Sequence, residues 1–180
     1  MTEVPLSLNY SSVVSRDSVR LAFLIEGLKK LDIMTCDVEN TYLSAPCWER
    51  IWFAAGPEHG PEKTSQVMVM VRSLYGLNNS GASWRKMFTE TLRDMDFVPK
   101  VDDPDIYHRR ARNPDGEDYY DLLSVYVDDL LRCLHNPQLI MDALALPYDL
   151  KDGSVGLPKI YLGAEMMKYQ VRISKSHWIM

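Results

Sequence analysis

Leu122–Arg132 reads Leu-Leu-Ser-Val-Tyr-Val-Asp-Asp-Leu-Leu-Arg, and the predicted fold is organised around it. The adjacent carboxylates Asp128 and Asp129 separate two apolar runs, and the first run carries the branched and aromatic residues that strands favour. This pattern predicts a strand, a tight turn and a second strand, with both acids at the tip of a hairpin. Asp-Asp is also a common turn composition, because aspartate tolerates irregular backbone and makes local hydrogen bonds. The pair therefore has two interpretations, an ordinary turn or a chemical site.

A second acidic position lies far upstream, where the apolar strand predicted at Ile33–Asp37 ends in a carboxylate. If this strand neighbours the hairpin in a sheet, Asp37 meets Asp128 and Asp129. Three converging carboxylates raise one another's pKa unless cations neutralise them. A site made of hard carboxylate oxygens suits Mg²⁺, with Mn²⁺ as a possible substitute. Two such ions, roughly 3.5–4 Å apart, stabilise the attacking and leaving oxygens in phosphoryl transfer.

Several short motifs, taken in order, resemble the reverse transcriptase of copia-type LTR retrotransposons. They are Asp37-Val38-Glu39-Asn40-Thr41-Tyr42-Leu43, Ser73-Leu74-Tyr75-Gly76-Leu77 followed by Trp84, Asp103-Pro104, Tyr126-Val127-Asp128-Asp129, and Leu162-Gly163-Ala164-Glu165. Each motif is weak alone, but their order and spacing together are specific, and they cover the chain from about Ser11 to near its C-terminus.

The resemblance implies an α+β fold, in which a polymerase palm-type antiparallel sheet carries the acids and helices pack on one face. Residues 1–10 are expected to be a mobile lead-in, and residues 11–180 a palm with partial fingers. The basic finger strands, the thumb and the RNase H domain of the family are expected to be absent from this chain.

The resemblance also implies roles for individual residues. The catalytic acids are Asp37, Asp128 and Asp129, which hold two Mg²⁺ ions together with the backbone carbonyl of Val38. The residues expected at the substrates are Tyr42, Tyr75, Gly76, Tyr126 and Lys151. Tyr42 matches a steric gate, whose ring leaves no room for a 2′-hydroxyl and so selects deoxynucleotides, although a half-buried packing aromatic is the alternative.

Tyr75 and Gly76 are expected against the incoming nucleotide and template, and Gly76 suits close backbone approach because it has no Cβ. Lys151 falls where polymerases place a lysine near the leaving pyrophosphate, as a general acid. An ordinary surface lysine is the alternative for Lys151. The chain departs from the family in one segment, where Asn78, Asn79, Ser80 and Gly81 replace a Lys-Gln-small-Pro pattern and remove a cationic phosphate contact.

Composition narrows the possible functions. The 180 residues are 46% hydrophobic and 25% charged, which is typical of a globular domain. The net charge of −5 argues against a self-sufficient nucleic-acid binder, because neutralising phosphates needs clustered Lys and Arg. The densest basic cluster is His108, Arg109, Arg110 and Arg112, which is either a solvated face or a template-backbone contact. No apolar run approaches the ~20 residues of a membrane span, and no signal peptide is recognisable.

Periodicity predicts the remaining elements. A largely buried helix starts near Ser15, with Leu21, Leu24, Ile25 and Leu28 at helical spacing and Val19, Ala22 and Phe23 widening its apolar face. Further predicted elements are a buried strand at Gln66–Arg72, a helix with an inner face of Trp84, Met87, Phe88, Leu92 and Met95, a hairpin of Asp105–Arg110 with Asp118–Tyr126, a short helix from Pro137 to about Leu146, and a closing hairpin of Tyr161–Met166 with Gln170–Ser174. The scattered Cys36, Cys47 and Cys133 are expected to be reduced thiols.

The predicted function is RNA-directed DNA polymerase, which transfers nucleotides from dNTPs to a primer 3′-hydroxyl. The partners it implies are an RNA template, a DNA or tRNA primer, and the thumb, RNase H and integrase domains of the same polyprotein. A homo-oligomer is a further possibility, and no association with a membrane is expected. The implied location is a cytoplasmic virus-like particle or the nucleus. Two alternatives remain open: a decayed or truncated palm without activity, and a non-enzymatic acidic α+β module that binds a cation or a protein partner.

Overall fold

The computed structural model describes residues 12–113, 115–171 and 175–179. The predicted lead-in at residues 1–10 lies outside them. The chain divides into two compact units. The smaller unit includes residues 40–88, and the larger unit combines residues 12–39 with the segment from Thr89 onward.

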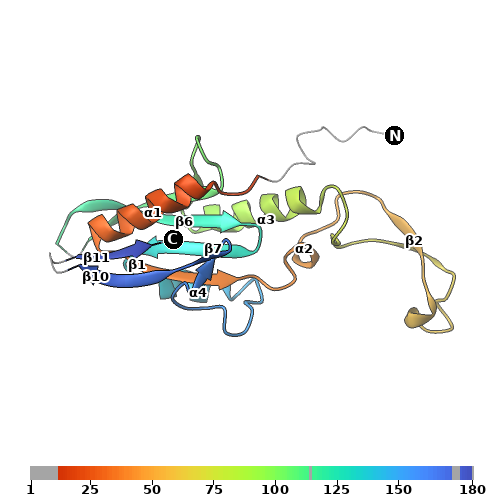
Figure 1. Cartoon of the computed structure of the whole chain (residues 1–180). Helices are drawn as coiled ribbons and strands as arrows, with labels where there is room; N and C mark the ends of the chain where they lie inside the picture. Colours follow the sequence, from red (N-terminus) through yellow and green to blue (C-terminus); the bar gives the residue numbers. More distant parts are fainter. Residues whose placement is uncertain (1–11, 114, 172–174, 180) are drawn as a thin grey trace. The chain divides into compact units, whose positions relative to one another are not determined.

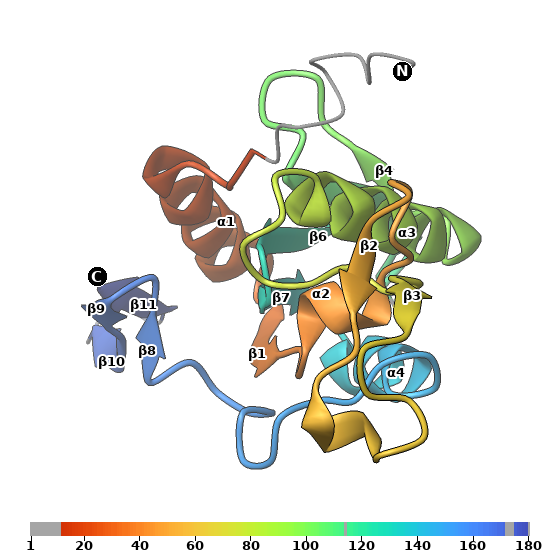
Figure 2. The ribbon, with the colours of Figure 1, turned by 90° about the vertical axis from the view of Figure 1, so that its right-hand side faces the viewer.

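A five-stranded antiparallel sheet forms the centre of the larger unit (Figure 1). In spatial order its strands are β1 (Asp32–Asp37), β7 (Asp129–Leu134), β6 (Asp118–Tyr126), β5 (Ile106–Arg112) and β4 (Val98–Pro99). The described residues form four α-helices, so the α+β class is confirmed. The helices do not share one face, however: α1 (Arg16–Lys29) and α4 (Pro137–Leu144) lie on opposite sides of the sheet (Figure 2). The central strands are apolar on both faces, so both faces need a cover.

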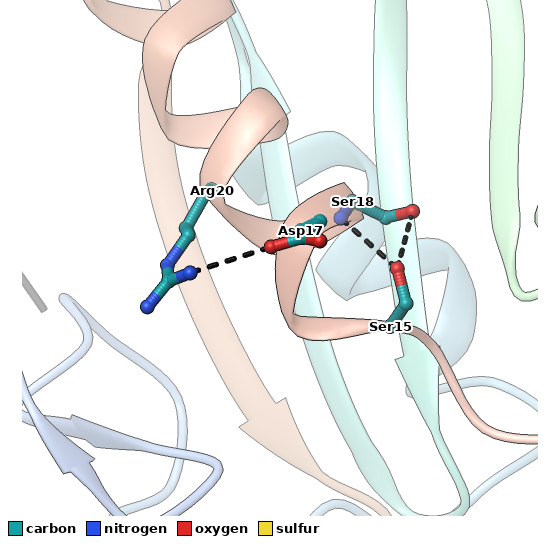
Figure 3. Close-up of polar contacts among 4 residues, drawn as sticks. All are labelled: Ser15, Asp17, Ser18 and Arg20. Carbon is teal, nitrogen blue, oxygen red and sulfur yellow. Dashed lines mark hydrogen bonds and ion pairs between the residues drawn. The ribbon is translucent and has the colours of Figure 1, made fainter.

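Helix α1 begins with a serine cap at Ser15 (Figure 3). The Ser15 hydroxyl accepts a hydrogen bond from the Ser18 backbone N–H at 3.1 Å, which satisfies one free donor of the first turn. Asp103 ties this cap to a distant loop, because its carboxylate accepts from the Ser15 N–H at 3.1 Å and from the Ser18 hydroxyl at 2.5 Å. Burial alone would raise the pKa of Asp103, but these hydrogen bonds and one from the Asp105 N–H lower it.

The face of α1 that packs on the sheet is not the predicted one. Leu21, Leu24 and Leu28 are 57%, 55% and 57% exposed, and Ile25 is also exposed. The buried residues are Val19, Ala22, Phe23, Glu26 and Gly27. The small residues on this face allow the helix to approach the sheet closely. Because α1 carries apolar side chains on more than one side, helical periodicity could not identify the buried face.

The hairpin of β6 and β7 is confirmed, with Tyr126 paired to Asp129 across a two-residue connection. Val127 has φ +58°, in the left-handed region that a β-branched side chain rarely adopts. Such a conformation costs about 1–2 kcal/mol, which the paired strands on either side offset. The turn that presents Asp128 is therefore strained.

The C-terminal strands pair differently from the prediction. Strand β8 (Ile160–Tyr161) pairs with β9 (Ala164–Glu165), and β10 (Met167–Val171) pairs with β11 (Lys175–Ile179). The single hairpin expected between Tyr161–Met166 and Gln170–Ser174 is thus wrong, and part of it lies outside the described residues. Lys168 in β10 reaches the buried carboxylate of Glu26 in α1 at 3.4 Å, and β11 also contacts α1.

The smaller unit contains short elements: α2 (Thr41–Ser44), β2 (Trp52–Ala54), a 3-10 turn at Pro57–His59, β3 (Val67–Val69) and the start of α3 (Ser80–Asp94). The predicted helical face of α3 is confirmed by the burial of Trp84, Phe88 and Leu92. The predicted burial of Gln66–Arg72 is wrong, because Val67 and Val71 are each 70% exposed. Within the described part of the chain, strand β3 pairs with β2 alone, and a two-stranded sheet buries little side-chain area. No helix among the described residues has the length and apolarity needed to cross a bilayer.

Candidate functional site

The sheet brings together the acids that are far apart in the sequence. Strands β1 and β7 are antiparallel neighbours, and Asp37 lies directly opposite Asp129. Asp128 occupies the turn before β7, and its carbonyl accepts a hydrogen bond from the Val38 N–H at 3.0 Å. The dipeptide Asp37-Val38 therefore runs antiparallel to Asp128-Asp129. Tyr126, at the end of β6, is 37% exposed beside them.

A segment after α4 adds Lys151 to this cluster. Residues 149–156 run along the outer edge of β1, where the Lys151 N–H donates to the Asp37 carbonyl at 3.0 Å. Further along, Thr35 and Gly156 exchange backbone hydrogen bonds at 2.8 and 3.1 Å. The Lys151 ammonium lies 3.1 Å from a carboxylate oxygen of Asp37. The structure thus places Lys151 beside the acids, and its role as a general acid near the leaving pyrophosphate stays a prediction.

The charges of the cluster perturb one another. Burial raises the pKa of Asp129, the charges of Asp128 and Asp37 raise it further, and Lys151 partly opposes them. The hydrogen bond and charge of Asp37 raise the pKa of Lys151, so its ammonium form is favoured. A lysine held in this way is a weaker proton donor than an ordinary one. In this arrangement Lys151 serves as a counter-charge to the acids.

Because the folded state raises the pKa of Asp129, ionising this group opposes folding. Its contribution to stability is lost as the pH rises from the ordinary aspartate pKa of about 3.9 through the raised value. Asp129→Asn is expected to increase the free energy of unfolding at pH 7 by about 0.5–1 kcal/mol, a small gain because the group is half-buried and Lys151 offsets some repulsion. At pH 3 the gain should disappear.

Urea denaturation at both pH values measures this effect. Asp118→Asn is the matched control, because Asp118 starts β6 at its far end and pairs with Arg112 at the surface at 2.8 Å. A destabilised Asp129→Asn protein at pH 7 would show that attraction to Lys151 outweighs the repulsion.

The donor set fits a hard divalent cation, since it offers carboxylate oxygens whose negative charges are only partly balanced by Lys151. Among the described residues, no three His, Cys, Asp or Glu side chains are arranged so that they could hold a metal ion. The carboxylate of Asp37 faces the Lys151 ammonium instead. Holding a cation with all three acids therefore requires their side chains to rotate and Lys151 to release Asp37.

Two of the predicted substrate residues meet in the smaller unit. The rings of Tyr42 and Tyr75 have centroids 4.8 Å apart and planes tilted by 49°. Tyr75 is 62% exposed, whereas Tyr42 is half-buried. Gly76 follows with φ +92°, and a Cβ added there would meet no atom within 4 Å. Glycine is thus needed at this position for its backbone conformation and leaves open space beside it.

The segment that departs from the family packs at the start of α3. Asn79 and Ser80 are buried, and the Ser80 hydroxyl donates to the Leu74 carbonyl at 2.6 Å. The buried Asn79 side-chain oxygen has no hydrogen-bond partner among the described residues.

One residue joins the site although the motifs did not predict it: the Ser154 hydroxyl accepts a hydrogen bond from the Asp37 N–H at 3.1 Å. The motifs also did not indicate that Arg132, on the strand that begins at Asp129, is fully buried. Nothing in the local pattern around Ser154 indicates its role. The burial of Arg132 was indicated by the sequence, since this charged residue lies inside an apolar run that is typical of a buried strand.

Comparison with known proteins adds an independent finding. A family model described as "Reverse transcriptase (RNA-dependent DNA polymerase)" matches residues 6–179. The chain is also 25% identical, over 180 aligned residues, to the retrovirus-related Pol polyprotein from transposon TNT 1-94 of Nicotiana tabacum. The alignment covers 94% of this chain and 12% of that polyprotein, so the chain spans about an eighth of its relative's length.

Proposed function

This chain belongs to the reverse transcriptase family, and from that premise we propose that it is the palm, with part of the fingers, of an RNA-directed DNA polymerase encoded by a retrotransposon Pol polyprotein. In this proposal residues 11–180 form that polymerase segment. The observation that carries the proposal is the pairing of Asp37 with Asp129 on neighbouring strands, with Asp128 in the adjoining turn.

Asp37, Asp128 and Asp129, with the carbonyl of Val38, would hold Mg²⁺ or Mn²⁺. When bound, two such ions acidify a primer 3′-hydroxyl and neutralise the charge that develops on the α-phosphate and the pyrophosphate. Burial and then the charges of Asp128 and Asp37 raise the pKa of Asp129, and the repulsive part of this effect supports the assignment, because added positive charge relieves it. With Asp37 engaged by a cation, the Lys151 ammonium would be able to pair with the anionic triphosphate.

Tyr42 and Tyr75 are proposed to bind the incoming nucleotide. Their ring contact makes one continuous aromatic surface, and the exposed face of Tyr75 can meet a sugar or base. The open space at Gly76 admits a template or nucleotide backbone close to the chain. Tyr126 is proposed to lie next to the primer end, since it directly precedes the acidic turn.

Primer extension tests the proposal. The assay uses an RNA template, a DNA primer, dNTPs and Mg²⁺ or Mn²⁺, with the 180-residue chain and with a version extended at both ends by its neighbouring polyprotein sequence. We expect the extended protein to add deoxynucleotides and to discriminate against ribonucleotides. If neither protein extends a primer although Mn²⁺ binds at the acids, polymerase activity is refuted for this copy.

The same assay tests the role of Tyr42. Tyr42→Ala should weaken the discrimination against ribonucleotides by roughly tenfold or more, since it removes the proposed steric block. Trp52→Ala is the aromatic control, because Trp52 is 63% exposed on β2 of the same unit and takes no part in the ring contact of Tyr42 with Tyr75. Unchanged discrimination in Tyr42→Ala would leave Tyr42 as a packing residue.

A second candidate is a folded but inactive copy of the same domain. The buried Arg132 and the unpartnered Asn79 oxygen favour it, because both place incompletely compensated polar groups in the interior. Primer extension decides between the two, provided that the extended protein shows a cooperative melt.

The tobacco relative is a Pol polyprotein of which this chain matches one part, so the remaining proposals concern the partners of this chain. We propose that thumb, RNase H and integrase segments of the same polyprotein work with this chain, on an RNA template and a DNA or tRNA primer. A virus-like particle in the cytoplasm, or the nucleus, is the proposed location.

A further inference from the structure

A pocket of about 500 Å³ opens on the larger unit, away from the acidic turn along the sheet. It is lined by Asp96, Val98, His108, Arg109, Arg110 and Tyr120. These residues come from the strands at one end of the sheet and from the turn that leads into β4. The size is that of a small-molecule site, and the lining combines cationic, aromatic and apolar groups.

Arg109 builds one wall of this pocket rather than offering charge to it. Its guanidinium donates to Asp121 at 2.7 and 3.1 Å and to the Met95 carbonyl at 3.2 Å, and it stacks on the Phe97 ring at 4.6 Å. All three guanidinium nitrogens thus donate to groups of the chain itself. The pair with Asp121 is close to neutral and holds β5 to β6.

Arg110 and His108 supply the pocket's available donors. Arg110 is exposed and makes no ion pair or hydrogen bond with the described part of the chain. The Nδ1 atom of His108 is shielded from solvent and has no partner among the described residues, so Nε2 is the ring nitrogen that can meet a ligand. A proton on Nε2 makes it a donor on the accessible side of the ring. Two donors of this kind suit a phosphate oxygen.

Tyr120 adds an aromatic surface directly across the strand pair from Arg110. Its side chain is 45% exposed, and its ring packs against His108 with centroids 5.5 Å apart, which limits the ring's motion. A half-exposed, anchored ring beside an available arginine is the arrangement on which a nucleobase stacks. Asp96 is the one acid of the lining, so it disfavours a bare anion and can accept a hydrogen bond from a sugar hydroxyl or a base amine.

We propose that this pocket binds a nucleotide unit, with its phosphate on Arg110 and His108 and its base stacked on Tyr120. The unit comes from a single-stranded RNA or DNA segment or from a free nucleotide, which share this chemistry. The site does not depend on the acidic turn, so it extends the proposed function without requiring catalysis.

Fluorescence anisotropy tests this with the full 180-residue chain, a labelled 12-nucleotide single strand of RNA or DNA, and EDTA to remove divalent metals. Arg110→Ala is expected to weaken binding about tenfold and to reduce the salt dependence by about one phosphate contact. Tyr120→Ala should weaken it roughly fivefold or more. Arg112→Ala is the matched control, because Arg112 is on the same strand, outside the pocket, and already paired with Asp118. Asp128→Asn should bind as the parent does.

Nuclear magnetic resonance locates the ligand directly. The imidazole resonance of His108, assigned by its loss in His108→Gln, should shift on addition of adenosine monophosphate or the strand. Inorganic phosphate should shift it less at equal concentration, because it lacks a base. If only the strand shifts it, the source is a nucleic acid; if the mononucleotide does so at equal concentration, the source is a free nucleotide.

Equal losses in Arg110→Ala and Arg112→Ala would overturn the proposal, since binding would then follow net charge alone. An unshifted His108 resonance at saturating strand and mononucleotide would overturn it as well. Loss of primer extension in Asp128→Asn with unchanged strand binding would separate this site from the proposed polymerase site.

Discussion

Asp128→Asn is expected to lower primer extension by the extended protein by about 10³-fold or more while the cooperative melt is retained. The proposed cations stabilise several kcal/mol of developing charge, and each 1.36 kcal/mol corresponds to a factor of about ten in rate. Asp128 lies in a turn and is half-buried. Replacing it with asparagine keeps its shape and removes one of the charges that raise the pKa of Asp129, so the fold has no reason to weaken.

The measurement combines single-turnover primer extension with a urea melt of the same sample. Asp118→Asn removes one carboxylate from the far end of β6, where it pairs with Arg112 of β5, and should leave the rate within a factor of about two of the parent. Full activity in Asp128→Asn would contradict the assignment of the site. Activity lost together with the cooperative melt would show that Asp128 is structural.

Arg132→Met is expected to produce the largest change in stability, an increase of about 2–4 kcal/mol in the free energy of unfolding. Arg132 is 0% exposed, and its Nε, Nη1 and Nη2 atoms have no hydrogen-bond partner among the described residues. Burial lowers the pKa of this guanidinium, and the neighbouring Cys36 offsets only part of that effect. The Cys36 sulfur beside it compensates only part of the desolvation cost of this buried charge, and the apolar methionine, similar in length, does not have that cost.

Urea midpoints at constant m-value measure this change, because a constant m-value shows that the unfolded state is unaltered. Arg112→Met is the control, since Arg112 is exposed, and its effect should stay within about 0.5 kcal/mol. A less stable Arg132→Met protein would mean that the guanidinium has compensating interactions in solution.

The effects of Arg132→Met on stability and on primer extension can be compared. Arg132 lies in β7, the strand that begins with Asp129. If Arg132→Met raises stability and also raises primer extension, the buried charge weakens the polymerase site. If it raises stability alone, the site tolerates the buried charge.

The sequence by itself determined the features that depend on near neighbours in the chain. The hairpin around Asp128-Asp129 and the inner face of α3 both arise from short-range patterns of turn residues and helical spacing. The motifs also predicted the family, because their order along the chain can be recognised without any knowledge of the fold.

The tertiary structure alone decided which distant segments meet. The segment of Lys151 and Ser154 lies on the edge of β1 through long-range backbone hydrogen bonds, which no local pattern encodes. The same is true of α1, whose Leu21 and Leu24 are exposed because the sheet accepts the side carrying Ala22 instead. Local sequence sets the conformation that a segment prefers, whereas burial depends on the surface that a segment finds, and that surface is made by residues far away in the chain.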